Sequence, residues 1–256
     1  MGARVHPTAV VDPGAELADG VRIGPLCHVG AGVVLGEDTE LVSHATVLGP
    51  SRIGRRNRVY PHATIGAAPQ DRSFRGEPTM LMVGDDNEFR ESVTAHRGTP
   101  KGGGVTRIGS GCLFMVGAHV AHDCTVGDGV TLANVTSLGG HVVVESRVVT
   151  GGHVAVAPFV RIGEIAFAAG GAMIERPVPP FVVVSGDRAR VRGLNSVGLE
   201  RAGVPEASRA ALEQAYRILF RKGVPLAVAL GEIDPALRGD SYVAKLFEFL
   251  AGTAHA

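Results

Sequence analysis

The sequence predicts a left-handed parallel β-helix of triangular cross-section, built from six-residue (hexapeptide) repeats and followed by a small C-terminal α-helical domain. Two observations lead to this prediction. Aliphatic residues recur at every sixth position over most of the first 174 residues, and a fixed period of this kind is typical of repeat architectures. The composition agrees, because 36 glycines, no tryptophan and 5% aromatic residues suit thin strands joined by tight turns.

The aliphatic repeat keeps its register over long stretches. It runs from Val5 to Ile65, returns over residues 83–89, and continues from Ile108 to Ile174 with one weak position at Thr150. The residue two places before each aliphatic position is usually small, and residues i and i−2 point to the same side of a strand. Each hexad is therefore expected to place one large and one small side chain inward, and three hexads would close one coil of a prism.

Cysteines and glycines occupy regular places in this repeat. Cys27, Cys112 and Cys124 all fall at the small inward position, so we expect them in the core. A glycine often follows the large inward residue, as Gly24 and Gly54 do. We expect these glycines to form the turns between strands with a positive φ.

Two polar insertions interrupt the repeat. The first covers about residues 67–82 and the second about residues 96–106, and both are rich in glycine or proline. Such segments are typical of loops. Repeat proteins admit insertions of this kind on one face, which is often the binding face.

The six-residue period ends at the proline-rich segment 176–180, and a helical pattern follows. Asn195 is a suitable helix cap, and Gly223 a suitable helix stop. We therefore divide the chain into a left-handed β-helix domain over residues 1–189 and a helical domain over residues 190–256. Helices are expected over residues 195–202, 206–222 and 241–250.

Charge and composition exclude several classes of function. The 25 basic residues balance the 25 acidic ones, so nothing indicates a nucleic-acid-binding protein. No apolar run reaches 18 residues and the N-terminus has no signal-peptide form, so we expect no membrane span. An odd number of cysteines without metal-ligand spacing argues against a disulfide framework, and we expect a cytoplasmic protein.

The segment Ala118–Cys124 (AHVAHDC) holds the main candidates for catalysis. The register places Ala118, Val120 and Cys124 at scaffold positions, which leaves His119 and His122 pointing outward beside Asp123. Histidine has an ordinary pKa of about 6.5 and can act as a general base near neutral pH. We expect His122 to be a catalytic base on the outer surface of the β-helix.

Several motifs resemble one particular family. The hexad repeat alone is shared by sugar and serine acyltransferases and by carbonic anhydrases. The segments AHVAHDC, RGEPT (75–79), HRGT (96–99) and GGHV (139–142) resemble the acyl-[acyl-carrier-protein]–UDP-N-acetylglucosamine O-acyltransferases, which begin lipid A biosynthesis. The resemblance covers nearly the whole chain, including both loops and the helical domain. It implies a homotrimer without a cofactor, whose active cleft lies between adjacent prisms.

The resemblance also implies roles for individual residues. His122 would take the proton of the sugar 3-hydroxyl as this oxygen attacks the 3-hydroxyacyl thioester of acyl carrier protein. Asp123 would orient His122, and the backbone N–H of Gly140 would stabilise the oxyanion. Gly170 would be the floor of the acyl-chain tunnel, without fixing the chain length. Further contacts with the UDP-sugar substrate are implied for His119, His141, Gln70, Asp71, Asn195 and Arg201, and contacts with acyl carrier protein for Arg217 and Arg221.

The sequence departs from the family at a few positions. Ser73 stands where the family commonly has a substrate-contacting lysine, and Ala157 and Pro158 replace a histidine and a glutamine. Val197 and Ala202 replace polar or charged residues near the nucleotide. These departures leave open which sugar is the acceptor, including whether it carries a 3-hydroxyl or a 3-amine. They do not affect the residues expected to carry out acyl transfer.

Two other interpretations stay open at this point. Zinc carbonic anhydrases with this fold share three histidine ligands between subunits, and His119, His122 and His141 are three candidates. Alternatively, the chain is a paralogue that acylates another amino nucleotide sugar, or a non-catalytic scaffold that binds the carrier protein.

Overall fold

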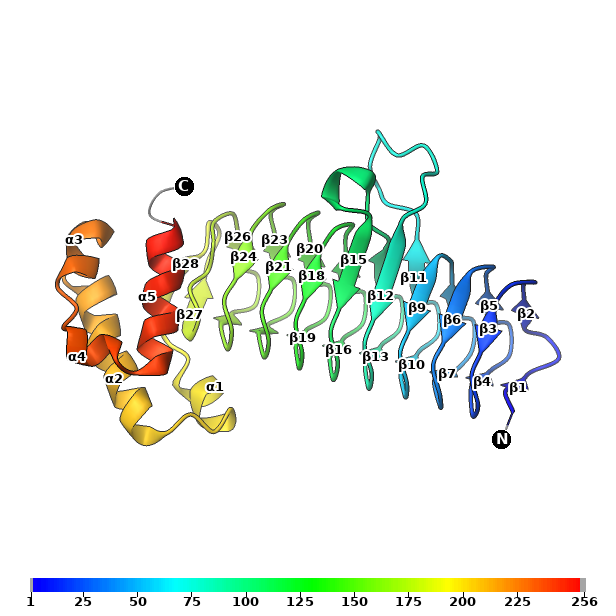
Figure 1. Ribbon diagram of the computed structural model, residues 1–256, viewed down its shortest axis with the longest axis horizontal. Coiled ribbons are helices and arrows are strands. Elements are labelled where there is room, and N and C mark those ends of the chain that lie inside the picture. Colours follow the sequence, from blue (N-terminus) through cyan, green and yellow to red (C-terminus); the bar gives the residue numbers. More distant parts are fainter. Residues whose placement is uncertain (1, 254–256) are drawn as a thin grey trace.

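The computed structural model describes residues 2–253, and it is a long three-sided prism with helices at one end (Figure 1). Its three faces are parallel sheets, here called A, B and C. The chain visits A, B and C in turn, so strands three apart in sequence are hydrogen-bonded neighbours. This topology confirms the predicted parallel β-helix followed by a small helical part.

Most strands contain two residues, as expected from a hexad that is largely turn. Sheet A contains β1 (Arg4–Val5), β4 (Arg22–Ile23), β7 (Glu40–Leu41), β10 (Arg58–Val59), β13 (Glu88–Phe89), β16 (Leu113–Phe114), β19 (Thr131–Leu132), β22 (Val149–Thr150), β25 (Phe167–Ala168), β27 (Val182–Ser185) and β28 (Arg190–Leu194). Sheet B contains β2 (Val10–Val11), β5 (His28–Val29), β8 (Thr46–Val47), β11 (Thr64–Ala67), β14 (Thr94–His96), β17 (His119–Val120), β20 (Ser137–Leu138), β23 (Ala155–Val156) and β26 (Met173–Ile174). Sheet C contains β3 (Glu16–Leu17), β6 (Val33–Leu35), β9 (Ser51–Ile53), β12 (Met80–Val83), β15 (Val105–Ile108), β18 (Thr125–Val126), β21 (Val143–Val144) and β24 (Arg161–Ile162).

The inward positions form the core that the repeat predicts. From Ile23 to Ile174 the large inward residues are buried, and all three cysteines are buried and free. Only the first coils differ, because no segment of residues 2–253 covers their open end and Val5 remains 45% exposed. The weak position Thr150 is also buried, where its hydroxyl pairs with that of Thr136 at 2.8 Å.

The prediction for the turn glycines is wrong for Gly24 and Gly54, although Gly66, which follows the inward Ile65, does have a positive φ of 83°. Gly24 and Gly54 do not have positive φ; the left-handed conformation falls instead on residues two places later, such as Leu26 and Arg56. A side chain at Gly24 would overlap the carbonyl oxygen of Val42 in the next coil. Glycine is therefore required at this position by the close approach of stacked coils, and the αL turn is made by other residues.

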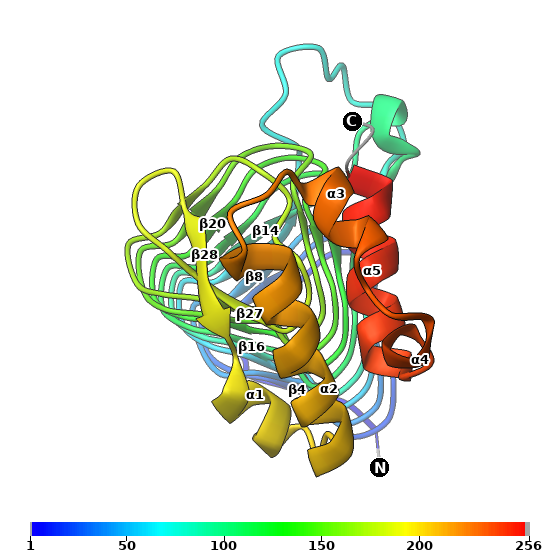
Figure 2. The same ribbon diagram turned by 90° about the vertical axis from the view of Figure 1, so that its left-hand side faces the viewer.

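The helical part closes one end of the prism (Figure 2). Strand β28 first returns antiparallel to β27, so residues 190–194 extend sheet A before any helix begins. Asn195 caps the first helix by accepting a hydrogen bond from Gly198 N at 3.0 Å, as predicted. The helices are α1 (Ser196–Arg201), α2 (Glu206–Tyr216) with a π-helical extension η2 (Arg217–Arg221), α3 (Leu226–Gly231), α4 (Pro235–Arg238) and α5 (Ser241–Thr253).

The prediction for the helices is thus right for α1, α2 and α5, but it missed α3 and α4. Both are short and begin beside a proline, at Pro225 and Pro235. Proline suits the first turn of a helix, yet segments of four to six residues show too little periodicity to be recognised.

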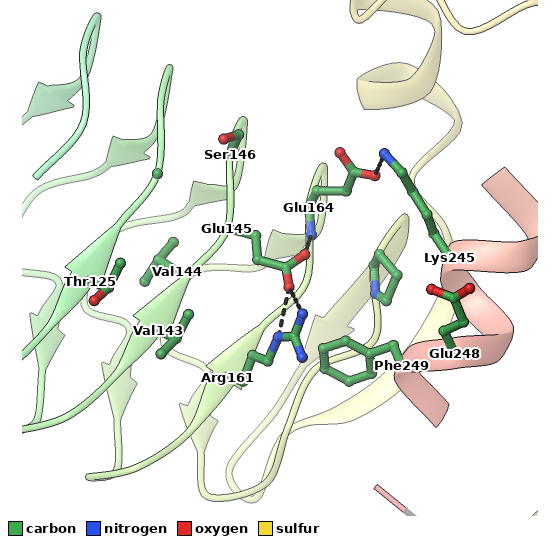
Figure 3. Close-up of a pocket in the computed structure, with 12 residues that line it drawn as sticks. Thr125, Val143, Val144, Glu145, Ser146, Arg161, Glu164, Lys245, Glu248 and Phe249 are labelled. Carbon is green, nitrogen blue, oxygen red and sulfur yellow. Dashed lines mark hydrogen bonds and ion pairs between the residues drawn. The ribbon is translucent and has the colours of Figure 1, made fainter. Parts of the chain in front are cut away.

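Helix α5 packs beside sheet C across a cleft of about 520 Å³ (Figure 3). Lys245 of α5 pairs with Glu164 at 2.5 Å, and the Arg161 guanidinium lies 5.0 Å from the centre of the Phe249 ring. Arg161 also pairs with Glu145. These contacts join the helices to the last coils of the prism.

Candidate active site

The corner between sheets B and C, here called the BC corner, carries the candidate catalytic residues. His122, Asp123, Gly140 and His141 lie there on successive coils. Both insertions leave the prism at the same corner, because each connects a strand of B to one of C (Figure 1). The loops cover residues 68–79 and 97–104, and the second includes a 3₁₀ turn, η1 (Pro100–Gly102).

The carboxylate of Asp123 is the centre of a hydrogen-bond network. Its side chain is 1% exposed. Thr99 of the second loop donates to it twice, from its backbone N at 2.7 Å and from its hydroxyl at 2.6 Å. His122 Nδ1 lies 2.8 Å from Asp123 Oδ2. Because an ionised carboxylate only accepts, Nδ1 of His122 carries a hydrogen and Nε2 is left as the proton acceptor.

Gly140 lies directly against the imidazole of His122. An ideal Cβ at this position would be 2.6 Å from His122 Cε1 and 2.9 Å from Nε2, so only glycine fits. Gly140 is buried, and its backbone N–H donates no hydrogen bond within residues 2–253. A free, buried N–H beside the proton acceptor has the features of an oxyanion-binding donor.

His141 forms the other wall of this group. Its Nε2 is 3.6 Å from Asp123 Oδ2, and its ring stands perpendicular to that of His122 with centroids 5.4 Å apart. The ring of His141 also stacks on that of Phe159, with ring centroids 4.5 Å apart. Phe159 is 75% exposed, so it presents a large apolar surface beside the polar cluster.

His119 lies on sheet B next to this corner. Its Nδ1 is 2.7 Å from the hydroxyl of Thr94, and its ring meets that of His96 edge-on at 5.0 Å. Burial lowers the pKa of His119, and it lowers the pKa of His96 to about 4. Both rings are therefore neutral at pH 7.

The first loop brings Asp71 close to the catalytic group. Hydrogen bonds from Ser73 lower the pKa of Asp71, the Lys101 ammonium lowers it further, and a protonated His122 would do the same. Gln70 is exposed on the same loop. Ser73 accepts a hydrogen bond from Lys101 Nζ at 2.9 Å, which joins the first loop to the second.

The residues that could hold a metal differ from the three histidines expected for a zinc enzyme. Within the part of the chain that the structure describes, the compact ligand group is His122, Asp123 and His141, with ligand atoms within 4.8 Å of one another. His119 is not in this group. Both oxygens of Asp123 already accept hydrogen bonds from Thr99.

Three of the predicted substrate-binding residues lie away from His122. Asn195 and Arg201 line a largely apolar cleft of about 740 Å³ between α1 and sheet A, here called the α1 cleft. Val197 and Ala202, two of the departures, line it as well. Gly170 lies at the corner between sheets A and B. Within one chain, the structure therefore does not bring these residues together with the BC corner.

Two polar side chains in the α1 cleft, Asn195 and Arg201, differ in whether they are already hydrogen-bonded. The Asn195 amide caps α1 and also donates to the Ile165 carbonyl at 2.7 Å. The side chain of Arg201 is exposed and makes no ion pair or hydrogen bond within residues 2–253, so its charge is available to a ligand.

The two arginines predicted to meet the carrier protein lie on η2. Arg217 is exposed and pairs with Glu213 at 2.5 Å. Arg221 is also exposed, and its guanidinium lies 5.8 Å from the centre of the Tyr216 ring.

A proton acceptor held by a buried carboxylate next to a free backbone donor is what acyl transfer requires, and on this scaffold it defines a β-helix acyltransferase. The acyl-[acyl-carrier-protein]–UDP-N-acetylglucosamine O-acyltransferase of Anaeromyxobacter sp. (strain Fw109-5) is 48% identical over 249 residues, which are 97% of either chain. The chain belongs to this family of O-acyltransferases.

Solved structures of relatives agree. The UDP-N-acetylglucosamine O-acyltransferase of Moraxella catarrhalis is 38% identical with a TM-score of 0.93, covering 99% of this chain and 98% of that one. The acyltransferase of Bacteroides fragilis is 31% identical with a TM-score of 0.93, covering 96% of each chain. A family model described as domain 2 of UDP-N-acetylglucosamine O-acyltransferase matches residues 178–255.

Sequence reasoning missed three residues at the BC corner. Thr99 belongs to the HRGT motif, but the motif does not predict the two hydrogen bonds by which Thr99 holds Asp123. His96 and Phe159 also contact the predicted histidines. The hexad register shows which side chains point outward, but it does not show which loop residue folds back onto them.

Proposed function

We propose that this enzyme transfers a 3-hydroxyacyl group from acyl carrier protein to the 3-position of UDP-N-acetylglucosamine, the first step of lipid A biosynthesis. The observation that supports it best is the Thr99–Asp123–His122 chain of hydrogen bonds, which leaves His122 Nε2 as a proton acceptor beside the free N–H of Gly140. The names of the relatives supply the two substrates.

The proposed reaction follows from these positions. His122 Nε2 removes the proton of the sugar 3-hydroxyl while the oxygen attacks the thioester carbonyl carbon. The tetrahedral oxyanion accepts a hydrogen bond from Gly140 N–H. The C–S bond then breaks, and the proton on His122 passes to the departing thiolate of the carrier. Asp123 stays ionised throughout and stabilises the imidazolium that forms in between.

We infer that the active enzyme is a homotrimer with sites shared between chains. The BC corner and the α1 cleft lie on different edges of one prism, so a ligand that contacts both needs two chains. Cyclic symmetry supplies this arrangement, since the BC corner of one chain can face the α1 cleft of the next. The exposed apolar ring of Phe159 at the BC corner is consistent with such an interface.

The remaining assignments complete the proposal. His119, His141, Gln70, Asp71, Asn195 and Arg201 contact the nucleotide sugar, Gly170 lies at the end of the acyl chain, and Arg217 and Arg221 contact acyl carrier protein. No helix within residues 2–253 is both long and apolar enough to cross a membrane. The free cysteines fit a reducing compartment, and we place the enzyme in the cytoplasm.

The decisive experiment is a product assay with 3-hydroxyacyl carrier proteins and a panel of UDP sugars. We expect His122→Ala to lower kcat by about 10²- to 10⁴-fold, the usual contribution of a general base, with unchanged thermal unfolding. His6→Ala, which removes an exposed histidine of the first coil, is the control and should keep full activity.

Three results would count against the proposal. Full activity of His122→Ala would remove His122 as the base. Transfer only to a 3-amino sugar would change the acceptor, and no transfer to any sugar by the wild-type enzyme would favour a non-catalytic scaffold.

A further inference from the structure

The two loops at the BC corner are joined to each other at their bases and near their tips. Arg97 N donates to the Ala67 carbonyl at 2.9 Å, and Gly98 N donates to the Met80 carbonyl at 3.2 Å. Further out, Lys101 Nζ donates to the Ser73 hydroxyl at 2.9 Å. The ammonium of Lys101 is thereby held at the seam between the loops.

The charge of Lys101 is not neutralised by an ion pair. Its side chain is exposed, and within residues 2–253 its hydrogen-bond partner is the neutral hydroxyl of Ser73, while the Asp71 carboxylate lies nearby without forming an ion pair. By contrast, Lys222 and Lys245 both pair with glutamates. An ammonium has three hydrogens to donate, and Ser73 uses one of them. Lys101 can therefore bind an anionic ligand without first breaking an ion pair.

Lys101 also belongs to the catalytic neighbourhood. It lies two residues after Thr99, which holds Asp123 by two hydrogen bonds. The next residue, Gly102, packs so closely on the Asp123 carboxylate that a Cβ there would overlap it. Asp71 is close enough to Lys101 for the ammonium to lower its pKa, after the hydrogen bonds from Ser73, and close enough to His122 for a protonated imidazole to do the same. The ammonium and the proton acceptor thus face the same rim of the site.

We propose that Lys101 is a phosphate-binding residue of the active site, held in place by Ser73. This inference rests on the proposed function, because both substrates of that reaction carry phosphate close to the reacting groups. These are the diphosphate of the nucleotide sugar and the phosphodiester of the carrier's pantetheine arm. An ammonium that donates to phosphate oxygens makes a charge-assisted bond. Ser73 replaces the lysine that the family commonly has, and Lys101 returns a cation to this position from the other loop.

The test measures KM for each substrate and kcat in Lys101→Met, together with the Kd of UDP-N-acetylglucosamine by calorimetric titration. A lost hydrogen bond to a charged group corresponds to about a tenfold rise in KM or Kd. We expect this rise with kcat within about twofold of the wild type. A rise for the UDP sugar identifies the diphosphate as the ligand, whereas a rise for the acyl carrier protein alone identifies the pantetheine phosphodiester.

Three further variants separate binding by the charge from a structural effect on the loops. Ser73→Ala removes the loop contact but keeps the ammonium, so its KM should rise less than that of Lys101→Met. The double variant Lys101→Met/Ser73→Lys returns an ammonium from the opposite loop and should restore KM in large part. Arg72→Met removes an exposed cation of the first loop and should leave KM unchanged.

The proposal is overturned if KM for both substrates is unchanged in Lys101→Met, or if only kcat falls. It is also overturned if Arg72→Met or Ser73→Ala reproduces the full effect. An inactive wild-type enzyme would instead refute the proposed function, and the titration would still test binding of the UDP sugar by Lys101.

Discussion

The carboxylate of Asp123 shows how one residue serves both the fold and the site. Asp123 makes the turn of its coil with a φ of 61°, and His141 does the same one coil later with a φ of 63°. Asp and His are among the residues that tolerate this left-handed conformation best. The turn also aims the Asp123 side chain at His122 and Thr99. The same backbone conformation thus closes the coil and fixes the tautomer of the proposed base.

The buried side chain of His96 is expected to make the stability of the fold depend on pH. It is 6% exposed, its Nδ1 has no hydrogen-bond partner within residues 2–253, and burial lowers its pKa to about 4. The unfolded chain, with an ordinary pKa near 6.5, binds this proton first. The stability that neutral His96 contributes is therefore present above pH 6.5 and is lost as the pH falls towards 4.

A variant isolates this effect. His96→Phe keeps the edge-on ring contact with His119 but cannot be protonated. Between pH 7 and 4 we expect the wild type to lose roughly 3 kcal/mol more unfolding free energy than the variant, from 1.36 kcal/mol per pKa unit. Urea unfolding at both pH values measures this difference. If the two proteins lose stability equally, His96 is not the group responsible.

At the scale of the coil, close stacking determines which residues are glycine. A Cβ on Gly24 would overlap the Val42 carbonyl oxygen, whereas a Cβ on Gly193 of β28 would meet nothing within 4 Å. Neither glycine has a positive φ, so the two differ in packing alone. We expect Gly24→Ala to destabilise the protein by about 1–3 kcal/mol, as for an overpacked core.

Thermal unfolding of the two variants tests this explanation. Gly193→Ala should unfold near the wild-type temperature, while Gly24→Ala should unfold several degrees lower. A similar small shift in both would show that the coils can separate to admit a methyl group.

The six-residue period of the sequence predicts some features of these coils and not others. The six-residue period predicts the prism, its inward residues and the outward direction of His119 and His122, because each depends on strand geometry alone. The period does not reveal why a position is glycine, since the close contact comes from a coil 18 residues away, as with Gly24 and Val42. It also cannot place Thr99 on Asp123, because the path of the second loop depends on its own turn.

At the scale of the whole molecule, the separation of the BC corner from the α1 cleft determines what a complete site requires. His122 lies on one edge of the prism, and Arg201 lies in the α1 cleft on another. In the proposed trimer, each site takes His122 from one chain and Arg201 from its neighbour. Single variants at either position would each disable every site of a homogeneous trimer, but they would do so from opposite sides of the interface.

Mixed trimers give the last prediction. When His122→Ala and Arg201→Ala chains are unfolded together in equal amounts and refolded, a site is intact only where both contributing residues are native. Random assembly of a cyclic trimer makes about one quarter of the sites intact. We expect the mixture to recover about a quarter of wild-type activity, measured by acyl transfer, while either variant refolded alone stays low. If the mixture only averages the two variants, each site lies within one chain and the shared-site proposal is wrong.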